Sequence, residues 1–369
     1  MEKISLYTVC MNRGHHLKET LPRNISENIS YPNLEFVILD YNSQDGIDEW
    51  VKENLMNYIE GGLIKYYKTY EPTVFSLSHS KNMALRLTTG DILCQLDADS
   101  FSGPDYAHWI SSVFNKYGSK AIATTLRPDS IPYPNLGGKL AFSKRDVTQA
   151  RGFDEAMVDY GMEDIDLVNR LEKIGGARVY IENDEYLKCI AHSDVERLEN
   201  YSLFNKVLKI YMTLKEEIFV DREVIYLLKD NQCYKIYYEY HEELKDQPSL
   251  SLDGWLIKKG GFQKGTYSCI SGKLELYFDG VPTDNYTLKE GTMVDSYNPV
   301  NVFFEVTKEM KYFPQSDSLF TNLLIAISEC LNRDKFKEND KNADAVNAKG
   351  WGKGQVYLNF DLTKPVVLP

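Results

Sequence analysis

The chain has 369 residues and a net charge of −12, with 43% hydrophobic and 26% charged residues. This length and composition suit two or three globular domains with a sizeable core, and the negative charge argues against nucleic acid as a partner. No run approaches the roughly 20 apolar residues of a membrane span, and the start at Met1 lacks signal-peptide character. We therefore expect a cytoplasmic protein, with peripheral association at the inner face of a membrane left open. The six cysteines include no C-x-x-C pair, which favours reduced, mostly buried thiols.

The first half of the chain alternates short apolar runs with helical patterns. The predicted strands are residues 4–10, 34–39, 63–67, 92–96, 121–125, 137–142, 178–181 and 187–191. The predicted helices are residues 17–28, 47–59 and 104–117. Residues 75–85 lead into another that is closed by Gly90, a further helix starts at Ser143, and one starts at Glu163 and ends at Gly175-Gly176. Strands that alternate with helices predict parallel βαβ units and an α/β fold.

From about residue 195 the pattern changes. We expect a long helix over 201–217, strands over 224–240, and a strand at 274–278 followed by an Asp279-Gly280 turn. Residues 319–331 have helical spacing, residues 334–349 are polar and predicted to be loose, and residues 355–362 predict a last strand. The predicted domains are a catalytic-type α/β domain at 1–200, a connector packing on it at 201–245, and a β-rich or α+β domain at 246–369.

Two carboxylates follow the apolar run Ile92–Leu96, one residue apart at Asp97 and Asp99. Alternate side chains of a strand share a face, so both can point the same way from the strand end. Open α/β sheets bind ligands at the carboxyl ends of their strands, and paired carboxylates there suit Mg²⁺ or Mn²⁺ held against phosphates. A solvated Asp-Ala-Asp turn is the alternative that this triplet alone leaves open.

A set of short segments in a fixed order resembles the inverting glycosyltransferases of the GT-A fold, family 2 in particular. The resemblance extends to the catalytic domains of β-1,4-galactosyltransferases and of chondroitin-polymerase-type GalNAc transferases. The segments cover roughly the first 200 residues. They are Cys10–Arg13, Leu39–Gly46, Ser80–Ala84, Leu96–Asp99, Gly137–Ser143, Gly152–Asp154, Gly161–Leu167 and His192.

The resemblance implies a metal site and a donor site. Asp99 would bind Mn²⁺ or Mg²⁺ directly, Asp97 would lie nearer the ribose and the metal's waters, and His192 would complete the site; Cys189 is a candidate softer ligand, with a buried strand thiol as its alternative. Asp40 would hold the uracil or ribose of a UDP-sugar, and Asn12, Arg13 and Lys81 would line the donor pocket. The full set of expected donor-binding residues is Cys10, Asn12, Arg13, Asp40, Asn42, Ser43, Lys81, Asn82, Gln95, Asp97 and Ala98.

The resemblance also implies an acceptor site and a base. Inversion needs one displacement and a base that deprotonates the acceptor hydroxyl. Asp164 matches the second acid of the family's Glu-Asp pair and is the expected base, while Glu163, Gly137 and Gly138 would bind the acceptor. A structural role for these carboxylates at a helix start is the alternative. Tyr160 and Met162 depart from the Trp and Gly that the galactosyltransferases favour, which leaves the acceptor open.

The resemblance therefore implies transfer of galactose, GalNAc or glucose from a UDP-sugar to a glycan or lipid-linked glycan, in bacterial surface-polysaccharide synthesis. Sugar-phosphate nucleotidyl transfer is an alternative, although Asn12-Arg13-Gly14-His15 is not its usual Gly-rich loop. A non-catalytic carbohydrate-binding or scaffold protein is another alternative. The aromatics Trp255, Tyr267, Tyr277 and Trp351 could form a glycan-stacking surface or β-domain core.

Overall fold

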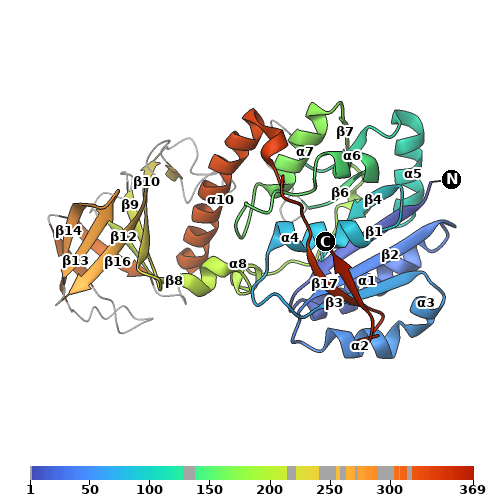
Figure 1. Ribbon diagram of the computed structural model, residues 1–369, viewed down its shortest axis with the longest axis horizontal. Coiled ribbons are helices and arrows are strands. Elements are labelled where there is room, and N and C mark those ends of the chain that lie inside the picture. Colours follow the sequence, from blue (N-terminus) through green and yellow to red (C-terminus); the bar gives the residue numbers. More distant parts are fainter. Residues whose placement is uncertain are drawn as a thin grey trace. The chain divides into compact units, whose positions relative to one another are not determined.

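The computed structural model describes residues 2–127, 138–213, 222–240, 255–257, 263–270, 273–289, 303–306, 308–313 and 318–369. The chain divides into two compact units (Figure 1). The first contains Met1–Ser193 together with Leu331–Pro369, and the second contains Asp194–Cys330. In the part of the chain that is described, no helix has the length and apolar character needed to span a bilayer.

The first unit contains a mixed sheet whose centre is parallel. Strands β1 (Ile4–Cys10), β2 (Leu34–Tyr41), β3 (Ile64–Thr69) and β4 (Ile92–Gln95) are parallel, in the order β3-β2-β1-β4. Strand β6 (Leu140–Ser143) pairs antiparallel with β4 and with β5 (Ala121–Thr124), and β7 (Ala177–Tyr180) adds to β5. Because β1 has β2 on one side and β4 on the other, the sheet has a topological switch point at β1.

Helices cover both faces of this sheet, because alternate strand residues bury in two apolar clusters. Ile4 and Phe36 face a cluster with α1 (Gly14–Asn28), α2 (Ile47–Asn54), α3 (Met56–Glu60) and α5 (Tyr106–Tyr117). Tyr7 and Val37 face the other cluster, with α4 (Leu77–Leu87), α6 (Lys144–Gln149) and α7 (Glu163–Lys173). The predicted α/β fold is confirmed. The predicted single helix over 47–59 is two helices, separated at Leu55.

The C-terminal residues complete the first unit, which places the domain border differently from the predicted 246. Strand β17 (Gly354–Leu358) pairs antiparallel with β3, and β18 (Pro365–Leu368) pairs with β17. The prediction of a loose stretch over 334–349 is wrong, since α10 (Ser318–Lys341) continues through its first part and a 3₁₀ turn (Ala343–Ala345) follows. The side chain of Asn339 donates to Asp154 Oδ2 at 2.7 Å and to Asp166 Oδ1 at 3.0 Å, which anchors this segment in the unit.

The second unit is rich in antiparallel strands. It begins with α8 (Asp194–Leu198) and α9 (Ser202–Lys206) and continues with β8 (Val207–Thr213), β9 (Arg222–Leu228) and β10 (Gln232–Tyr240). The remaining strands are β11 (Trp255–Ile257), β12 (Gln263–Ile270), β13 (Lys273–Phe278), β14 (Val281–Lys289), β15 (Phe303–Val306) and β16 (Lys308–Phe313). Pairing runs from β10 through β12 to β16, then through β8 and β9 back to β10, so the ladder closes on itself.

Two predictions in the C-terminal half have definite outcomes. The long helix over 201–217 is wrong, because β8 begins at Val207 and pairs with β9; a short helix followed by an amphipathic strand gives an apolar pattern close to that of one helix. Residues 214–217 lie outside the described residues. Tyr267 packs against an apolar cluster of the second unit, as the β-domain-core alternative expected. Trp351 instead packs against an apolar cluster of the first unit, and the side chain of Trp255 is outside the described set.

Candidate active site

The carboxyl ends of β1, β2 and β4 bring three loops to one edge of the sheet. The loops after β1 and β2 are joined directly: Asn12 N donates to Ser43 Oγ at 3.0 Å, and Gln44 N donates to Asn12 Oδ1 at 2.8 Å. Asn12 has a φ of 55° and Asn42 a φ of 62°, the left-handed region that asparagine tolerates best among residues with a side chain. The predicted donor-binding residues Asn12, Asn42 and Ser43 therefore lie together.

Asp40 is fully buried at the end of β2, and both of its oxygens are engaged. Oδ2 accepts from Tyr66 Oη at 2.6 Å and lies 3.2 Å from Lys68 Nζ, and Oδ1 accepts from Ser43 N at 2.7 Å. Burial raises the pKa of Asp40, while the bonds from Tyr66 and Ser43 and the charge of Lys68 oppose that rise. Asp40 thus holds the Asn42–Ser43 loop in place.

Two of the three predicted metal ligands, Asp99 and His192, are in contact at the end of β4. His192 Nε2 lies 3.0 Å from Asp99 Oδ2, and Ile190 N donates to Asp99 O at 2.9 Å. Asp97 lies against Gly138, where an added Cβ would come within 2.3 Å of Asp97 Oδ2, so a larger residue there would displace the Asp97 carboxylate. Burial raises the pKa of Asp97 to about 6; the neighbouring charge of Lys81 lowers it and that of Asp99 raises it.

This donor set fits a divalent cation. It combines two carboxylates with one imidazole, which suits Mn²⁺ and also accommodates Mg²⁺. Asp97 and Asp99 are close enough that the charge of one raises the pKa of the other, a repulsion that a bound cation relieves. Asp99 and His192, with Asp97 close enough for both of their charges to affect its pKa, are therefore the residues that could hold a cation.

The predicted catalytic pair begins helix α7. Lys81 Nζ lies 3.0 Å from Glu163 Oε1 and 2.8 Å from Asp164 Oδ1, and its side chain is 1% exposed. Burial raises the pKa of Asp164 well above its ordinary value, Lys81 opposes this rise, and Glu163 adds to it. Lys81, expected to face the donor's phosphates, is instead the counter-ion of Glu163 and Asp164, two residues more than 80 positions away in the chain.

Gln95 lies between Gly138, which is next to Asp97, and Asp164, the expected base. Its Nε2 donates to Gly138 O at 2.7 Å and lies 3.5 Å from Asp164 Oδ1, while its Oε1 accepts from Tyr7 Oη at 3.1 Å. Gly138 in turn contacts Asp97. Asp97 and Asp164 are therefore connected through Gly138 and Gln95 at the end of β4.

The other expected residues have different surroundings. Asn82 donates to Phe153 O at 2.8 Å and accepts from Phe153 N at 2.7 Å, so it holds the turn around Phe153. Cys10 is buried, which raises the pKa of its thiol to about 12, and Ala98 O accepts from Thr20 Oγ1 at 2.7 Å. Arg13 is the N-cap residue of α1, and Cys189 forms a β-bridge with Ser100. Gly137 and most of the loop 127–135 lie outside the described residues.

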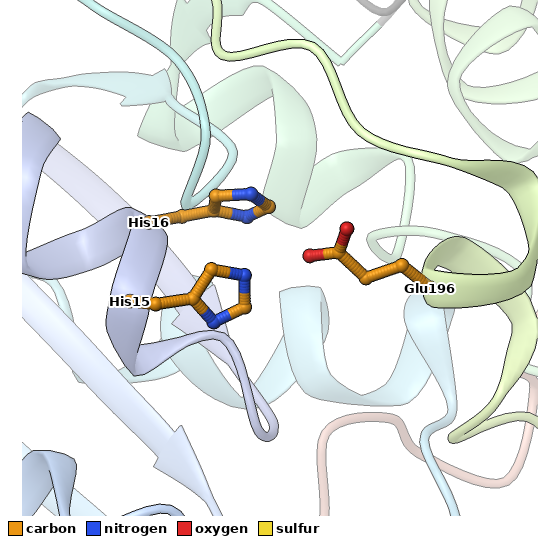
Figure 2. Close-up of side chains that lie close together, drawn as sticks. All are labelled: His15, His16 and Glu196. Atoms are coloured by element: carbon orange, nitrogen blue, oxygen red, sulfur yellow. The ribbon is translucent and has the colours of Figure 1, made fainter.

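Two histidines that sequence reasoning missed flank this edge on α1. Figure 2 shows His15 and His16 side by side; their ring centroids are 4.1 Å apart, and the ring of buried His16 is 5.4 Å from that of His192. The signal available in the sequence was their position directly after the first strand's loop. The approach of His16 to His192, 176 positions later, depends on the tertiary fold.

Comparisons with known proteins agree with this architecture. Residues 5–134 match the model described as glycosyl transferase family 2, and residues 122–209 match the model described as N-terminal domain of galactosyltransferase. Together these matches span the segments that carry Asp97, Asp99, Glu163, Asp164 and His192.

Similar solved structures include a mannosyltransferase from Pyrobaculum calidifontis in complex with GDP-Man and Mn²⁺ (21% identity, TM-score 0.41, 52% of this chain and 56% of that chain). TarS 1–349 from S. aureus in complex with UDP (13%, 0.41, 50% and 59%) and Drosophila β1,4-galactosyltransferase 7 with manganese, UDP-Gal and xylobiose (14%, 0.38, 55% and 76%) are others. The chain spans just over half the length of the first of these structures. At these scores the structural likenesses do not identify an activity.

Among curated proteins, autophagy-related protein 17 of Kluyveromyces lactis is 25% identical over 175 residues, which are 45% of this chain and 38% of that protein. The chain thus spans less than two thirds of that relative's length.

Proposed function

We propose that this chain, whose first unit is a family 2-like glycosyltransferase of the GT-A fold, transfers a hexose or N-acetylhexosamine from a UDP-sugar to a glycan acceptor. The donor sugar is of the galactose, GalNAc or glucose type, the reaction inverts the anomeric carbon, and a divalent cation is required. A glycan or lipid-linked glycan of a bacterial surface polysaccharide is the proposed acceptor.

One observation carries this proposal. The Asp99–His192 pair at 3.0 Å and the Lys81–Asp164 pair at 2.8 Å lie at the switch point of the sheet, where Gln95 contacts both Asp164 and Gly138, and Gly138 lies against Asp97. A site for a leaving diphosphate and a base for an incoming hydroxyl are the two requirements of a single-displacement sugar transfer. Residues suited to each requirement at one strand end support the proposal.

Asp97, Asp99 and His192 would hold Mn²⁺ or Mg²⁺, which when bound neutralises charge on the leaving diphosphate. The acidic side chains cannot replace the cation in this role, because carboxylates alone would repel a diphosphate. The loops that contain Asn12 and Ser43, which are hydrogen-bonded to each other, would receive the uridine. Asp40 would act indirectly, by holding the Ser43 loop in place through its hydrogen bond from Ser43 N.

In the transfer step, the acceptor oxygen bonds to the anomeric carbon while its proton passes to the carboxylate of Asp164. The bond from that carbon to the diphosphate oxygen breaks, and its electron pair leaves with UDP, so the configuration inverts. The positive charge of Lys81 favours the ionised form of Asp164, because it opposes the rise in pKa that burial causes. In its ionised form, a carboxylate with a raised pKa is a stronger proton acceptor than an exposed aspartate.

The test is UDP release from UDP-galactose, UDP-GalNAc and UDP-glucose, with Mn²⁺ and then with excess EDTA. We expect release from at least one donor with Mn²⁺ and its loss in EDTA. Full turnover in EDTA would contradict the metal role. Pyrophosphate release from UTP and a sugar phosphate, without UDP release, would favour nucleotidyl transfer, and no turnover together with glycan binding would favour the non-catalytic alternative.

A further inference from the structure

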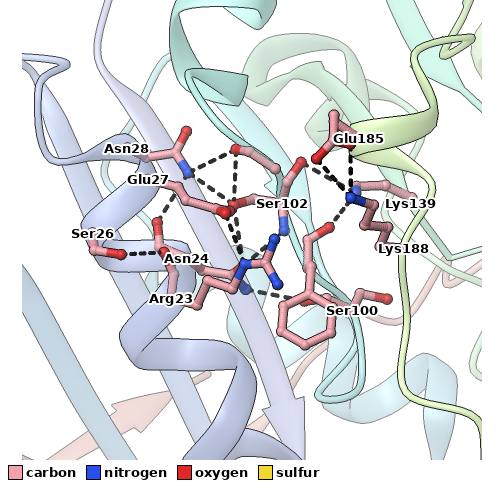
Figure 3. A network of polar contacts seen from close by, with 12 residues as sticks. Arg23, Asn24, Ser26, Glu27, Asn28, Ser100, Ser102, Lys139, Glu185 and Lys188 are labelled. Carbon is pink, nitrogen blue, oxygen red and sulfur yellow. Dashed lines mark hydrogen bonds and ion pairs between the residues drawn. The ribbon is translucent and has the colours of Figure 1, made fainter.

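Lys139 enters the core of the first unit just before β6 and beside Gly138. Its side chain is 1% exposed, and burial lowers the pKa of its ammonium group to about 7. Figure 3 shows the side chain within a polar network that includes Ser100 and Ser102 on one side and the segment Glu185–Lys188 on the other. Neither the metal site nor the transfer step described above uses this lysine.

The ammonium group donates to backbone carbonyls of two separate segments. Phe101 O lies 2.5 Å from Nζ and Ser102 O lies at 3.4 Å, and Tyr186 O is the third acceptor. Gly103 marks how closely the two segments approach, because an added Cβ there would come within 2.6 Å of Glu185 O. Lys139 therefore joins the chain that follows Asp99 to the chain that precedes His192.

The same two segments continue side by side to the metal site. Phe101 N donates to Lys188 O at 3.0 Å, Ser100 forms a bridge with Cys189, and Ile190 N donates to Asp99 O at 2.9 Å. These contacts lead directly to the pair of Asp99 and His192 at 3.0 Å. A shift at the Lys139 end would therefore change the separation of the two ligands at the other end.

Packing alone does not account for a lysine here. Among the residues that the structure describes, no carboxylate lies within the 4.0 Å ion-pair distance of Lys139, so its acceptors are carbonyl groups only. Burying an ammonium group without a carboxylate is costly, and a methionine would fill similar space without that cost. The ammonium group of Lys139 supplies three N–H donors from one atom, which no apolar side chain can do.

We propose that Lys139 is a positioning residue that sets the separation of Asp99 and His192 and thereby the affinity of the site for its divalent cation. This inference rests on the proposed function, since it requires that Asp99 and His192 bind the cation. Asn24 supports the same segment from α1, donating to Ser100 O at 3.0 Å and accepting from Ser102 N at 2.7 Å. The contact from Lys139 to Tyr186 O is what ties this supported segment to the His192 segment.

The experiment is an electron paramagnetic resonance titration of the full chain with Mn²⁺ alone, together with the nitrogen coupling of bound Mn²⁺ at saturation. Lys139→Met is compared with wild type and with Lys144→Met. Lys144 is a matched control, because its Nζ also donates to a backbone carbonyl, that of Thr88, at the opposite end of β4. His192→Gln calibrates the loss of imidazole coupling.

We expect Lys139→Met to bind Mn²⁺ about tenfold or more weakly, a loss of affinity typical of removing a residue that supports a metal ligand. The variant should also lose the imidazole coupling of bound Mn²⁺. Lys144→Met should match wild type in both measurements. Wild-type affinity and wild-type coupling in folded Lys139→Met would overturn the role of Lys139. If the methionine variant does not fold, Lys139→Gln, which keeps an amide donor on a shorter side chain, decides the question by the same two readouts. No Mn²⁺ binding by wild type would instead contradict the metal site of the proposed function.

Discussion

Two aspartates of the first unit, the buried Asp40 and the partly exposed Asp164, have lysine partners and raised pKa values but differ in how their oxygens are engaged. The side chain of Asp40 is 1% exposed, with both oxygens bonded to neighbours. That of Asp164 is 13% exposed, and its contacts to Lys81 and Gln95 are all made through Oδ1. A lysine partner and a raised pKa are therefore common to both carboxylates, whereas partial exposure and contacts through a single oxygen suit Asp164 to its proposed role as the base.

Among substitutions that test this difference between Asp40 and Asp164, Asp164→Asn should have the largest effect, on the rate of sugar transfer. The amide keeps the size of the side chain but cannot accept the acceptor's proton, so sugar transfer should fall by about 10²- to 10⁴-fold. The thermal midpoint and Mn²⁺ affinity should stay close to wild type. Transfer within a few-fold of wild type would mean that another residue is the base.

Asp40→Asn should have the opposite profile. It removes a charge paired with Lys68 and disturbs bonds from Tyr66 and Ser43 in a site without solvent, so we expect the free energy of unfolding to fall by about 3 kcal/mol. Turnover per folded molecule should change less than in Asp164→Asn. Denaturant unfolding and UDP release on the same samples separate the two effects, and unchanged stability with abolished turnover would place Asp40 in the chemistry.

A third carboxylate extends the comparison to the amino end of the strands. Burial alone would raise the pKa of Glu35, but hydrogen bonds from Lys65, Ser5 and Thr89 lower it to about 2. A lowered pKa means that the stabilisation is present above pH 4.5 and is lost as the pH falls toward 2, by up to about 3 kcal/mol. When the free energy of unfolding is measured against pH, Glu35→Gln should lack the loss of stability that wild type shows between pH 4.5 and 2. Parallel curves for the two proteins would contradict this role of Glu35.

The smallest expected effect is a shift of the pH–rate profile when Lys81 is replaced. Because its charge lowers the pKa of Asp164, Lys81→Met should raise that pKa further and move the acidic limb of the pH–rate profile to higher pH. Activity at high pH should be less affected. A limb that stays in place would mean that Asp164 does not limit the acidic side of the profile.

The sequence predicted the parts of the fold that depend on local pattern. Strands β1 to β6 lie where apolar runs occur, and Asp97 and Asp99 follow β4 as the strand-end argument required. What could not be predicted depends on contacts distant in sequence. The pairing of Lys81 with Asp164, the return of β17 to β3 and the position of Lys139 between Phe101 and Tyr186 carry no local signal.

The return of β17 also changes how the second unit can be studied. A chain cut near residue 245 would lose β17, β18 and Asn339, all of which complete the first unit. Loss of UDP binding in such a truncation would report damage to the first unit, not a role of the second.

The proposed function rests on the claim that Asp99 binds a cation that in turn helps to hold the donor's diphosphate. The most direct test is calorimetry of UDP binding with and without Mn²⁺, for wild type and for Asp99→Asn. Because coupled ligands strengthen one another's binding, Mn²⁺ should raise the UDP affinity of wild type by about tenfold or more. In Asp99→Asn the gain should shrink to about twofold or less. An equal gain in both proteins would contradict the claim.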